Sequence, residues 1–252
     1  MKTKKAIITT SWDDGHQLDL KLNHLLNKYN LKGTFYVPKQ YPIKPGLKKN
    51  EIKEIAINHE IGAHGLSHTR LNSISLSDAK IEIGGSKKYL ENLLNKPIKM
   101  FSYSGGLFNE KIKKIVQEEG YLGARTTKKF QIKEPIDFFA LGVTNQVYPH
   151  PFRKKNDNSL HLSSALLQPL RGNFSGIRKF KLPIKAFFSW SEMMKGLFDY
   201  VCENNDVWHC WGHSWEIEKY NMWQDLENVF NYISNKENVL YLTNSQVLEN
   251  YE

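Results

Sequence analysis

The feature that most constrains the fold is a repeated alternation of short apolar runs with longer segments that carry apolar residues at helical spacing. Residues 5–11 and 33–37 are apolar runs of strand length, and the leucines between them recur at helical spacing over 18–29. Such alternation is typical of α/β proteins with a largely parallel sheet. About seven or eight strand–helix units of this kind predict a barrel-like α/β fold.

The same alternation continues through most of the chain. The further strands that we expect lie at 60–65, 98–102, 121–126, 138–147, 207–211 and 239–242. The further helices lie at 50–56, 76–94, 109–119, 185–200 and 223–233, and Gly84-Gly85 weakens the longest of them. Because no internal repeat and no Gly/Ser-rich linker divides the chain, we expect residues 1–252 to form a single domain.

One segment breaks the pattern. Residues 148–183 contain four prolines, little periodicity and scattered basic residues. We interpret this segment as a long irregular insertion, with a short helix predicted only at 159–167. A loop of this length in a compact domain is usually functional, for example as a lid.

The composition supports a folded core, since 40% of the 252 residues are hydrophobic. The formal charge of +9 at pH 7 favours a phosphate-bearing partner, which is nucleic acid, an anionic membrane surface or a small phosphorylated substrate. Composition alone does not choose among these partners.

The positive charge is concentrated in one part of the chain. Between 128 and 185 there are eleven Lys and Arg but only three acids. A patch at the mouth of an active site favours a small diphosphate over nucleic acid, so we expect no nucleic-acid partner; a solvated charged loop is the alternative. The basic residues expected to grip a diphosphate are Arg153, Lys154, Lys155, Arg178 and Lys179.

Two cysteines, Cys202 and Cys210, are too few for a disulfide framework and are expected to be reduced thiols. The apolar run near the amino terminus stops at 9–14, too early for a cleaved signal peptide. No stretch reaches the ~18 apolar residues of a membrane span. We therefore expect a cytoplasmic protein without a transmembrane segment. The oligomeric state is left open.

Polar clusters follow three of the expected strands, where an α/β barrel places its active site. The first cluster is Asp13 and Asp14, followed by Gly15. Adjacent carboxylates can take different roles, one as a metal ligand and one as a base. The alternative is a simple turn, since Asp-Gly is common in turns.

The second cluster contains His64 and His68. Two histidines four residues apart can lie on one side of a helical turn and bind the same metal. Together with Asp14 they make three protein ligands that leave one position open for water. This pattern is typical of a catalytic metal site. Satisfied structural histidines are the alternative.

The third cluster spans residues 208–216, which read Trp-His-Cys-Trp-Gly-His-Ser-Trp-Glu. Histidine at this position can protonate a leaving group, and the aromatic side chains can line an acyl or sugar pocket. Core packing is the alternative for the tryptophans. The interleaved polar residues favour a functional role.

Taken in chain order, these clusters resemble the motifs of the polysaccharide deacetylases, the NodB-homology carbohydrate esterases. The family's first motif, usually Thr-Phe-Asp-Asp-Gly, corresponds to Ser-Trp-Asp-Asp-Gly at 11–15. Its His-x-x-x-His motif corresponds to 64–68, and its late His motif to Gly-His-Ser at 212–214. The resemblance covers residues 6–216 and implies a distorted (β/α)7-type barrel.

The resemblance also implies a mechanism. Asp14, His64 and His68 become ligands of a divalent metal, with Zn²⁺ the first choice and Co²⁺, Ni²⁺ or Fe²⁺ as alternatives. Asp13 becomes the general base and His213 the general acid. A bound metal ion makes hydroxide available at neutral pH.

The third motif departs from the family pattern. Where the family often has Phe-Arg-x-Pro-Tyr-Gly, residues 101–106 read Phe-Ser-Tyr-Ser-Gly-Gly. The arginine that orients the base is thus replaced by Ser102. Either the site has decayed or another cation substitutes, and we favour Arg125 at the end of the next strand. Gly105 matches the position whose backbone N–H helps to form the oxyanion hole. We find no match to the family's fourth motif.

The function implied by the resemblance is removal of an N-acetyl group from an amino sugar. We expect an intracellular nucleotide- or lipid-linked sugar of surface-polysaccharide synthesis, which would bring a phosphate. The alternatives are hydrolysis of a cyclic amide or ureide C–N bond and a non-catalytic sugar-binding barrel. The residues expected to bind substrate are Tyr103, Trp211, Trp215, Arg153 and Lys154.

Overall fold

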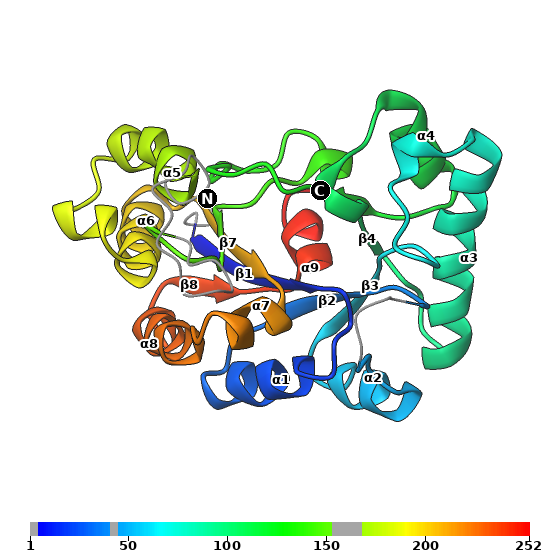
Figure 1. Cartoon of the computed structure of the whole chain (residues 1–252), viewed down its shortest axis with the longest axis horizontal. Coiled ribbons are helices and arrows are strands. Elements are labelled where there is room, and N and C mark those ends of the chain that lie inside the picture. The colour runs from blue at the N-terminus through cyan, green and yellow to red at the C-terminus, as the bar shows by residue number, and fades with distance from the viewer. Residues whose placement is uncertain (1–4, 41–44, 153–167) are drawn as a thin grey trace.

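A curled parallel β-sheet forms the centre of the protein, and helices cover its outer face (Figure 1). The structure is a computed structural model that describes residues 5–40, 45–152 and 168–252. The strand order is β5-β4-β3-β2-β1-β7-β6, with β8 paired to β1, and every pairing between strands is parallel. The predicted α/β class with a parallel sheet is therefore confirmed.

The elements follow the expected alternation closely. The strands are β1 (Ala6–Asp13), β2 (Gly33–Val37), β3 (Glu60–Ala63), β4 (Met100–Ser102), β5 (Gly123–Arg125), β6 (Asn145–Gln146), β7 (Val207–Gly212) and β8 (Val239–Tyr241). The α-helices are α1 (Asp19–Lys28), α2 (Lys49–Ile55), α3 (Leu76–Leu94), α4 (Glu110–Glu118), α5 (Gln168–Lys179), α6 (Trp190–Asn204), α7 (Ser214–Lys219), α8 (Trp223–Ile233) and α9 (Asn244–Glu249).

Strand β1 is buried along its whole length and organises the sheet. β7 runs beside it on one side, while β8 and then β2 pair with its other edge. Because side chains alternate along a strand, Ile8 and Trp12 pack against helices, whereas Ser11 and Asp13 point into the curl of the sheet. This alternation places Asp13 at the carboxyl end of the central strand, facing the interior.

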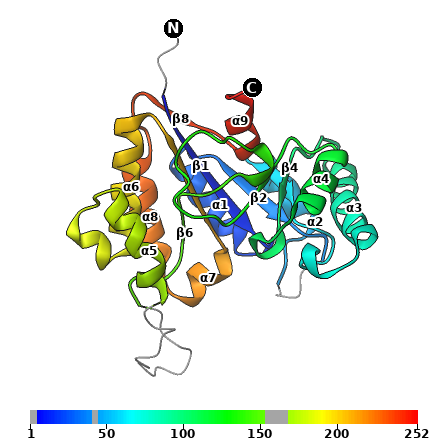
Figure 2. The ribbon, with the colours of Figure 1, turned by 90° about the horizontal axis from the view of Figure 1, so that it is seen from above.

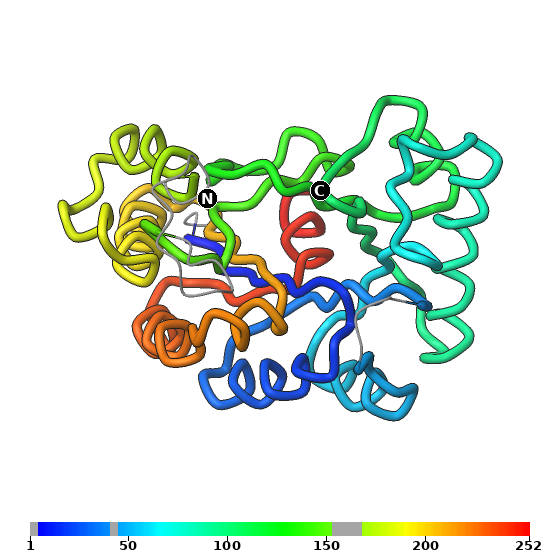
Figure 3. Tube along the Cα trace, viewed as in Figure 1, coloured from blue at the N-terminus to red at the C-terminus, as the bar shows by residue number. Residues whose placement is uncertain are grey.

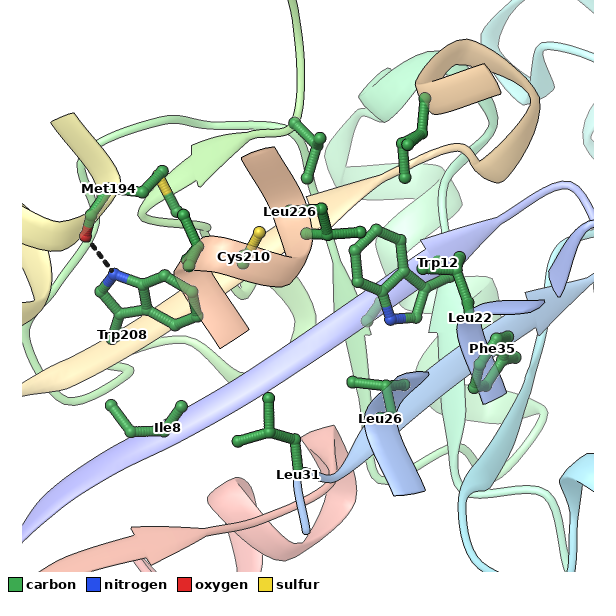
Figure 4. Packing of buried hydrophobic residues seen from close by; sticks show 14 of the residues in the cluster. Ile8, Trp12, Leu22, Leu26, Leu31, Phe35, Met194, Trp208, Cys210 and Leu226 are labelled. Carbon is green, nitrogen blue, oxygen red and sulfur yellow. Dashed lines mark hydrogen bonds between the residues drawn. The ribbon is translucent and has the colours of Figure 1, made fainter. Parts of the chain in front are cut away.

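The main hydrophobic core lies between the outer face of the sheet and the helices (Figure 4). Trp208 and Cys210 of β7 face this layer, next to Met194 of α6 and Leu226 of α8. The indole N–H of Trp208 donates to the carbonyl of Met194 at 3.2 Å. The core is thus built from alternate residues of each strand, which leaves the other alternate residues for the interior of the curl.

Helix α9 closes the amino-terminal side of the curl, at the end where β1 begins (Figure 2). At its first residue, Asn244 accepts a hydrogen bond from the Tyr36 hydroxyl at 2.8 Å and donates to the Thr9 hydroxyl at 2.9 Å. Its backbone N–H donates to the hydroxyl of Thr34. Since this side is filled, substrate has access from the carboxyl ends of the strands.

Gly84-Gly85 does not weaken the long helix as expected, and α3 runs unbroken from Leu76 to Leu94. A Cβ atom at Gly85 would lie 2.8 Å from Leu66, and one at Gly84 would collide with Glu119. The two glycines therefore allow close packing of the helix against its neighbours, which sequence spacing alone does not reveal.

The stretch from β5 to β7 differs most from expectation (Figure 3). The strand predicted at 138–147 is reduced to the two residues of β6, preceded by a short 3-10 turn. The segment 148–183 is not wholly irregular, because Gln168–Lys179 forms α5. The short helix predicted at 159–167 lies outside the described residues.

Two further expectations concern the whole chain. Cys202 and Cys210 are free thiols in the structure. Within the described ranges, no helix combines the length and apolar character that crossing a bilayer requires. A single-domain organisation of residues 1–252 stays a prediction.

We predict that Trp208→Ala lowers the free energy of unfolding by about 3–5 kcal/mol, because it empties a fully buried site. Trp208→Phe keeps most of the packing but loses the hydrogen bond to Met194. It should therefore lower the free energy of unfolding by a smaller amount, about 1 kcal/mol for the hydrogen bond. Urea unfolding followed by circular dichroism measures both. Equal stability of Trp208→Ala and wild type would contradict this account of the core.

Candidate active site

Most of the predicted site residues converge on one cavity of about 410 Å³ at the carboxyl ends of the strands. Residues from the ends of β1, β3 and β7 and from the loops after β4 and β5 line it. Its lining residues are Asp13, Asp14, His64, His68, Gly105, Thr127, Lys129, Gln146, Trp211, His213 and Trp215. Segments far apart in the chain thus meet where a barrel enzyme places its chemistry.

Asp14, His64 and His68 form a cluster whose ligand atoms all lie within 4.8 Å of one another. Asp14 Oδ1 lies 3.4 Å from Nε2 of His68 and 3.7 Å from Nε2 of His64. This oxygen is buried and has no hydrogen-bond partner among the described residues. An orphaned carboxylate oxygen facing two imidazole nitrogens fits a divalent cation, and the His₂Asp donor set suits Zn²⁺ and related metals.

The orientation of His64 and the protonation state of His68 both suit metal binding. Nδ1 of His64 donates to the carbonyl of Ser102 at 2.8 Å, which turns Nε2 toward Asp14, as in many metal sites. Burial and the neighbouring His64 lower the pKa of His68 to about 4, so its imidazole is neutral at pH 7. Neutral imidazole is the form that binds metal.

The four-residue spacing predicted that His64 and His68 share a helical turn, and this prediction is wrong. Residues 64–68 form a loop after β3, and His68 has a positive φ of 59°. Glu82 of α3 holds this loop: its carboxylate accepts the backbone N–H groups of Leu66 and Ser67 and the Ser67 hydroxyl. Hydrogen bonding to a neighbouring helix therefore brings the two rings to 4.7 Å between centroids.

Arg125 lies against Asp13, and its guanidinium donates to both carboxylate oxygens. It also donates to the hydroxyl of Ser102 at 2.8 Å. Ser102 and Arg125 are directly paired in register between β4 and β5. The small side chain of Ser102 thus leaves room for an arginine from the next strand to reach the aspartate.

The ion pair between Arg125 and Asp13 is fully enclosed. Arg125 is 0% exposed, and its guanidinium lies 4.8 Å from the ring centroid of Trp211 and 5.2 Å from that of Tyr36. Burial alone would raise the pKa of Asp13, but Arg125, with smaller contributions from His64 and His213, lowers it. Asp13 is therefore ionised at neutral pH.

His213 is oriented by Glu216, one turn into α7. Its Nδ1 donates to the Glu216 carboxylate at 2.6 Å, and its Nε2 lies 3.7 Å from Asp14. Burial would lower the pKa of His213, but the hydrogen bond to Glu216 and the charge of Asp14 raise it to about 9. The imidazole is thus protonated at pH 7, as a proton donor must be.

The aromatic side chains divide into two groups. Trp211 and Trp215 line the cavity, and the Trp215 indole donates to Asp14 at 2.9 Å. Tyr103 does not line it: the ring is 1% exposed and stacks on Phe108, and the hydroxyl donates to a backbone carbonyl. The structure thus contradicts the expectation that Tyr103 contacts substrate. Gly105 lines the cavity and has a φ of 68°, a conformation that favours glycine.

The cluster at 208–216 contributes only some of its polar residues to the cavity. His209 is 1% exposed and faces the interior below it. Its Nδ1 donates to the carbonyl of Gly142, and its Nε2 accepts from the hydroxyl of Ser11. His209 is therefore a structural histidine that connects β1, β7 and the segment before β6.

Sequence reasoning missed three cavity residues: Thr127, Lys129 and Gln146. Lys129 is half-buried, its pKa is lowered by burial, and its ammonium approaches the side-chain oxygen of Asn173 at 3.4 Å. No carboxylate of the described residues lies within ion-pair distance of it. The available signal was the position of Lys129, four residues after the arginine that ends β5.

Of the five basic residues predicted to grip a diphosphate, the structure describes Arg178 and Lys179. A larger cavity of about 640 Å³ adjoins the site at Thr127 and is lined in part by Lys128 and Lys179. Arg178 lines neither cavity and lies over the ring of Phe174. Three other expected binding residues, Arg153, Lys154 and Lys155, lie outside the described residues.

Comparisons with solved structures give the fold. A Mycobacterium smegmatis protein assigned to the polysaccharide deacetylases is 15% identical, with 99% of this chain and 91% of that one covered and a TM-score of 0.69. A family 4 acetyl xylan esterase from Clostridium thermocellum is 13% identical over 96% and 90% of the chains, with a TM-score of 0.56. The expected distorted (β/α)7-type barrel is thereby confirmed.

A third structure, the Streptococcus pyogenes deacetylase PplD in complex with acetate, is 22% identical with a TM-score of 0.50. The alignment covers 52% of this chain and 61% of PplD, so this chain spans less than two thirds of that protein. We found no match among curated proteins.

The family comparison agrees with the motifs. Residues 1–124 match the family described as polysaccharide deacetylase. This stretch contains the aspartate pair, both histidine candidates for metal binding and the departing third motif. The resemblance inferred from the motifs is confirmed over residues 1–124, which make up just under half of the chain.

Proposed function

We propose that this protein is a metal-dependent hydrolase that removes the N-acetyl group from an amino sugar. We further propose that the sugar carries phosphate, as a nucleotide- or lipid-linked intermediate, and that the reaction takes place in the cytoplasm, where the two cysteines stay reduced. The observation that carries the proposal is the orphaned, buried Oδ1 of Asp14 beside the Nε2 atoms of His64 and His68.

Asp14, His64 and His68 would hold the divalent ion, and a bound ion of this kind supplies an activated water at neutral pH. Asp13 is placed to accept the proton of that water, because it lies 3.9 Å from His64 on the same cavity wall. Arg125 keeps the Asp13 carboxylate ionised and fixes its orientation. A base that is already ionised and oriented requires no reorganisation before it accepts a proton.

His213 has the opposite role. Its Nε2 faces the cavity while Nδ1 is engaged by Glu216, so a proton on Nε2 is available to the departing amine. The backbone N–H of Gly105 is the candidate donor to the carbonyl oxygen of the acetamide as negative charge develops there. Trp211 and Trp215 would pack against the sugar and the acetyl methyl.

Lys129 supports a substrate with an anionic group. It contributes a positive charge to the cavity wall without a carboxylate partner among the described residues. Lys128 and Lys179 extend this positive character into the adjoining cavity. A phosphate attached to the amino sugar would pair with these charges.

The first prediction concerns the metal. The protein purified with one equivalent of Zn²⁺, Co²⁺ or Ni²⁺ should release acetate from UDP-linked or lipid-linked N-acetyl sugars, and chelation should abolish the release. Asp14→Asn should reduce metal content and rate by more than the roughly 10–100-fold typical of losing an outer-sphere partner. Acetate assays and elemental analysis measure both.

Asp225→Asn, an exposed carboxylate on α8, is the matched control and should leave both measurements unchanged. Ring opening of a cyclic amide or ureide without acetate release would contradict the proposed reaction. So would full activity of the metal-free protein.

The second prediction concerns Arg125. Arg125→Ser should reduce kcat by about 10²–10⁴-fold. It should also destabilise the protein by about 3–5 kcal/mol, because it leaves a buried carboxylate without its partner. Since Arg125 lowers the pKa of Asp13, its loss raises that pKa, and the acidic limb of the pH–rate profile should move to higher pH.

The double variant Ser102→Arg/Arg125→Ser is the specific control, because it returns a guanidinium from the paired position on β4. We expect it to recover at least tenfold of the lost rate and to move the acidic limb back. If Arg125→Ser is as active as wild type in its folded fraction, Arg125 does not position the base.

The third prediction concerns Lys129. Lys129→Met should raise KM for a phosphate-bearing N-acetyl sugar by about 10–100-fold, the effect of losing a hydrogen bond to a charged group. The KM for the same sugar without phosphate should change little. Lys111→Met on α4 serves as the control. Equal effects on the two substrates would exclude a role for Lys129 in binding phosphate.

A further inference from the structure

An exposed apolar groove of about 360 Å³ lies on the outer side of α5, and the described residues that line it are all apolar. They are Pro151, Phe152, Leu170, Phe174, Ile184, Phe187 and Phe188, and we call this groove with its rim the α5 patch. Ile184 is 74% and Phe188 69% exposed. Of the ten large hydrophobic side chains exposed in the described residues, four belong to this patch, whereas the others are dispersed along the chain. Such a concentration marks an interaction surface.

The segment from 168 to 191, which carries most of the patch, is positively charged, although Lys179 lines the larger cavity beside the active site and not the groove. From 168 to 191 the sequence contains five Lys and Arg and no acid. All five side chains are exposed: Arg171, Arg178, Lys179, Lys181 and Lys185. Only Lys185 pairs with a carboxylate, that of Glu192, among the contacts within the described residues.

Helical spacing places charge and apolar surface on the same face. Arg171 and Arg178 lie three residues before and four residues after Phe174, so all three side chains share one face of α5. The Arg178 guanidinium lies 5.8 Å from the ring centroid of Phe174. An exposed face that combines aromatic side chains with long basic ones is typical of protein that inserts into the interface of a bilayer, where the basic groups reach the headgroups.

We propose that the α5 patch docks the protein on the surface of an anionic lipid bilayer. The exposed Phe and Ile side chains enter the interfacial region, and the surrounding Arg and Lys pair with lipid phosphates. Charge complementarity favours this occupant over a second copy of the chain. A two-fold interface at the patch would bring Arg171 and Arg178 of one copy close to the same two cations of the other.

The patch borders the active site through α5. Asn173, on the buried face of α5, accepts a hydrogen bond from the ammonium of Lys129, which lines the candidate active site. The next residue, Phe174, belongs to the patch. Docking would therefore hold the cavity close to the membrane surface. If the proposed function is correct, this placement selects lipid-linked over nucleotide-linked sugars.

The test is co-sedimentation of the full chain with vesicles. We expect binding to phosphatidylcholine vesicles that contain 30% phosphatidylglycerol, but not to pure phosphatidylcholine. Because each cation near an anionic surface adds roughly fivefold to partitioning, Arg171→Glu/Arg178→Glu should weaken binding by more than about 25-fold. Ile184→Ser/Phe188→Ser should weaken it at least tenfold. In 0.5 M NaCl, where the Debye length is only about 4 Å, binding should be lost.

Matched controls carry the same changes at exposed positions elsewhere: Ile57→Ser/Ile81→Ser and Lys53→Glu/Lys111→Glu. Both should bind vesicles like wild type. Wild-type binding by the patch variants overturns the proposal. So does a dimer of the wild type that these variants convert to monomer in sedimentation velocity, because a second copy would then occupy the patch.

Acetate release from a soluble N-acetyl substrate separates this proposal from the proposed function. The patch variants should keep wild-type rates on that substrate, and Asp14→Asn should keep vesicle binding. Vesicle binding without deacetylation would leave the docking proposal standing and refute the function. Deacetylation without vesicle binding would leave the proposed function standing and refute the docking proposal.

Discussion

The buried ion pair between Arg125 and Asp13 is the interaction on which the rest of the site depends. Arg125 lies on β5 and Asp13 on β1, four steps apart in the sheet order. Strands about 4.8 Å apart would separate them by roughly 19 Å in a flat sheet, far beyond the reach of an arginine. The pair forms only because the sheet curls. Charge pairing and barrel curvature therefore require each other.

Enclosing this pair has consequences for the interior of the curl. A buried carboxylate and guanidinium are costly unless both stay paired and hydrogen-bonded. The interior near the pair accordingly contains polar groups: Ser11, His209 and Asn244 connect strands to one another and to α9 by side-chain hydrogen bonds. The same network that satisfies these groups closes the amino-terminal side and leaves the cluster of Asp14, His64 and His68 at the open side. Polarity inside the curl and apolar packing outside it follow from one alternation along each strand.

The sequence predicts the site residues that lie next to a strand end. It does not predict those whose position depends on the conformation of a loop. Asp14, His64 and Arg125 each follow or end a strand, so parallel pairing alone brings them to one edge of the sheet. The sequence therefore predicts their place in the site. Tyr103 also follows a strand, but its ring stacks on Phe108, a contact that spacing does not encode. Lys129 reaches the cavity only through the course of the long connection between β5 and β6. Such a course depends on tertiary contacts such as that with Asn173.

Helix α5 escaped prediction for a physical reason that also explains the basic segment. Its buried face presents Pro169, Asn173 and Gly176, with Ile177 as the only large apolar residue, so the usual apolar period is absent. Gly176 is required there because the ring of Phe130 occupies the space of a side chain. Without the helix, the positive charges of this segment look like one undivided cluster. The helix places its buried residue Asn173 beside Lys129, and Arg171 and Arg178 on the exposed face around Phe174, so the positive charges of this segment do not form one surface.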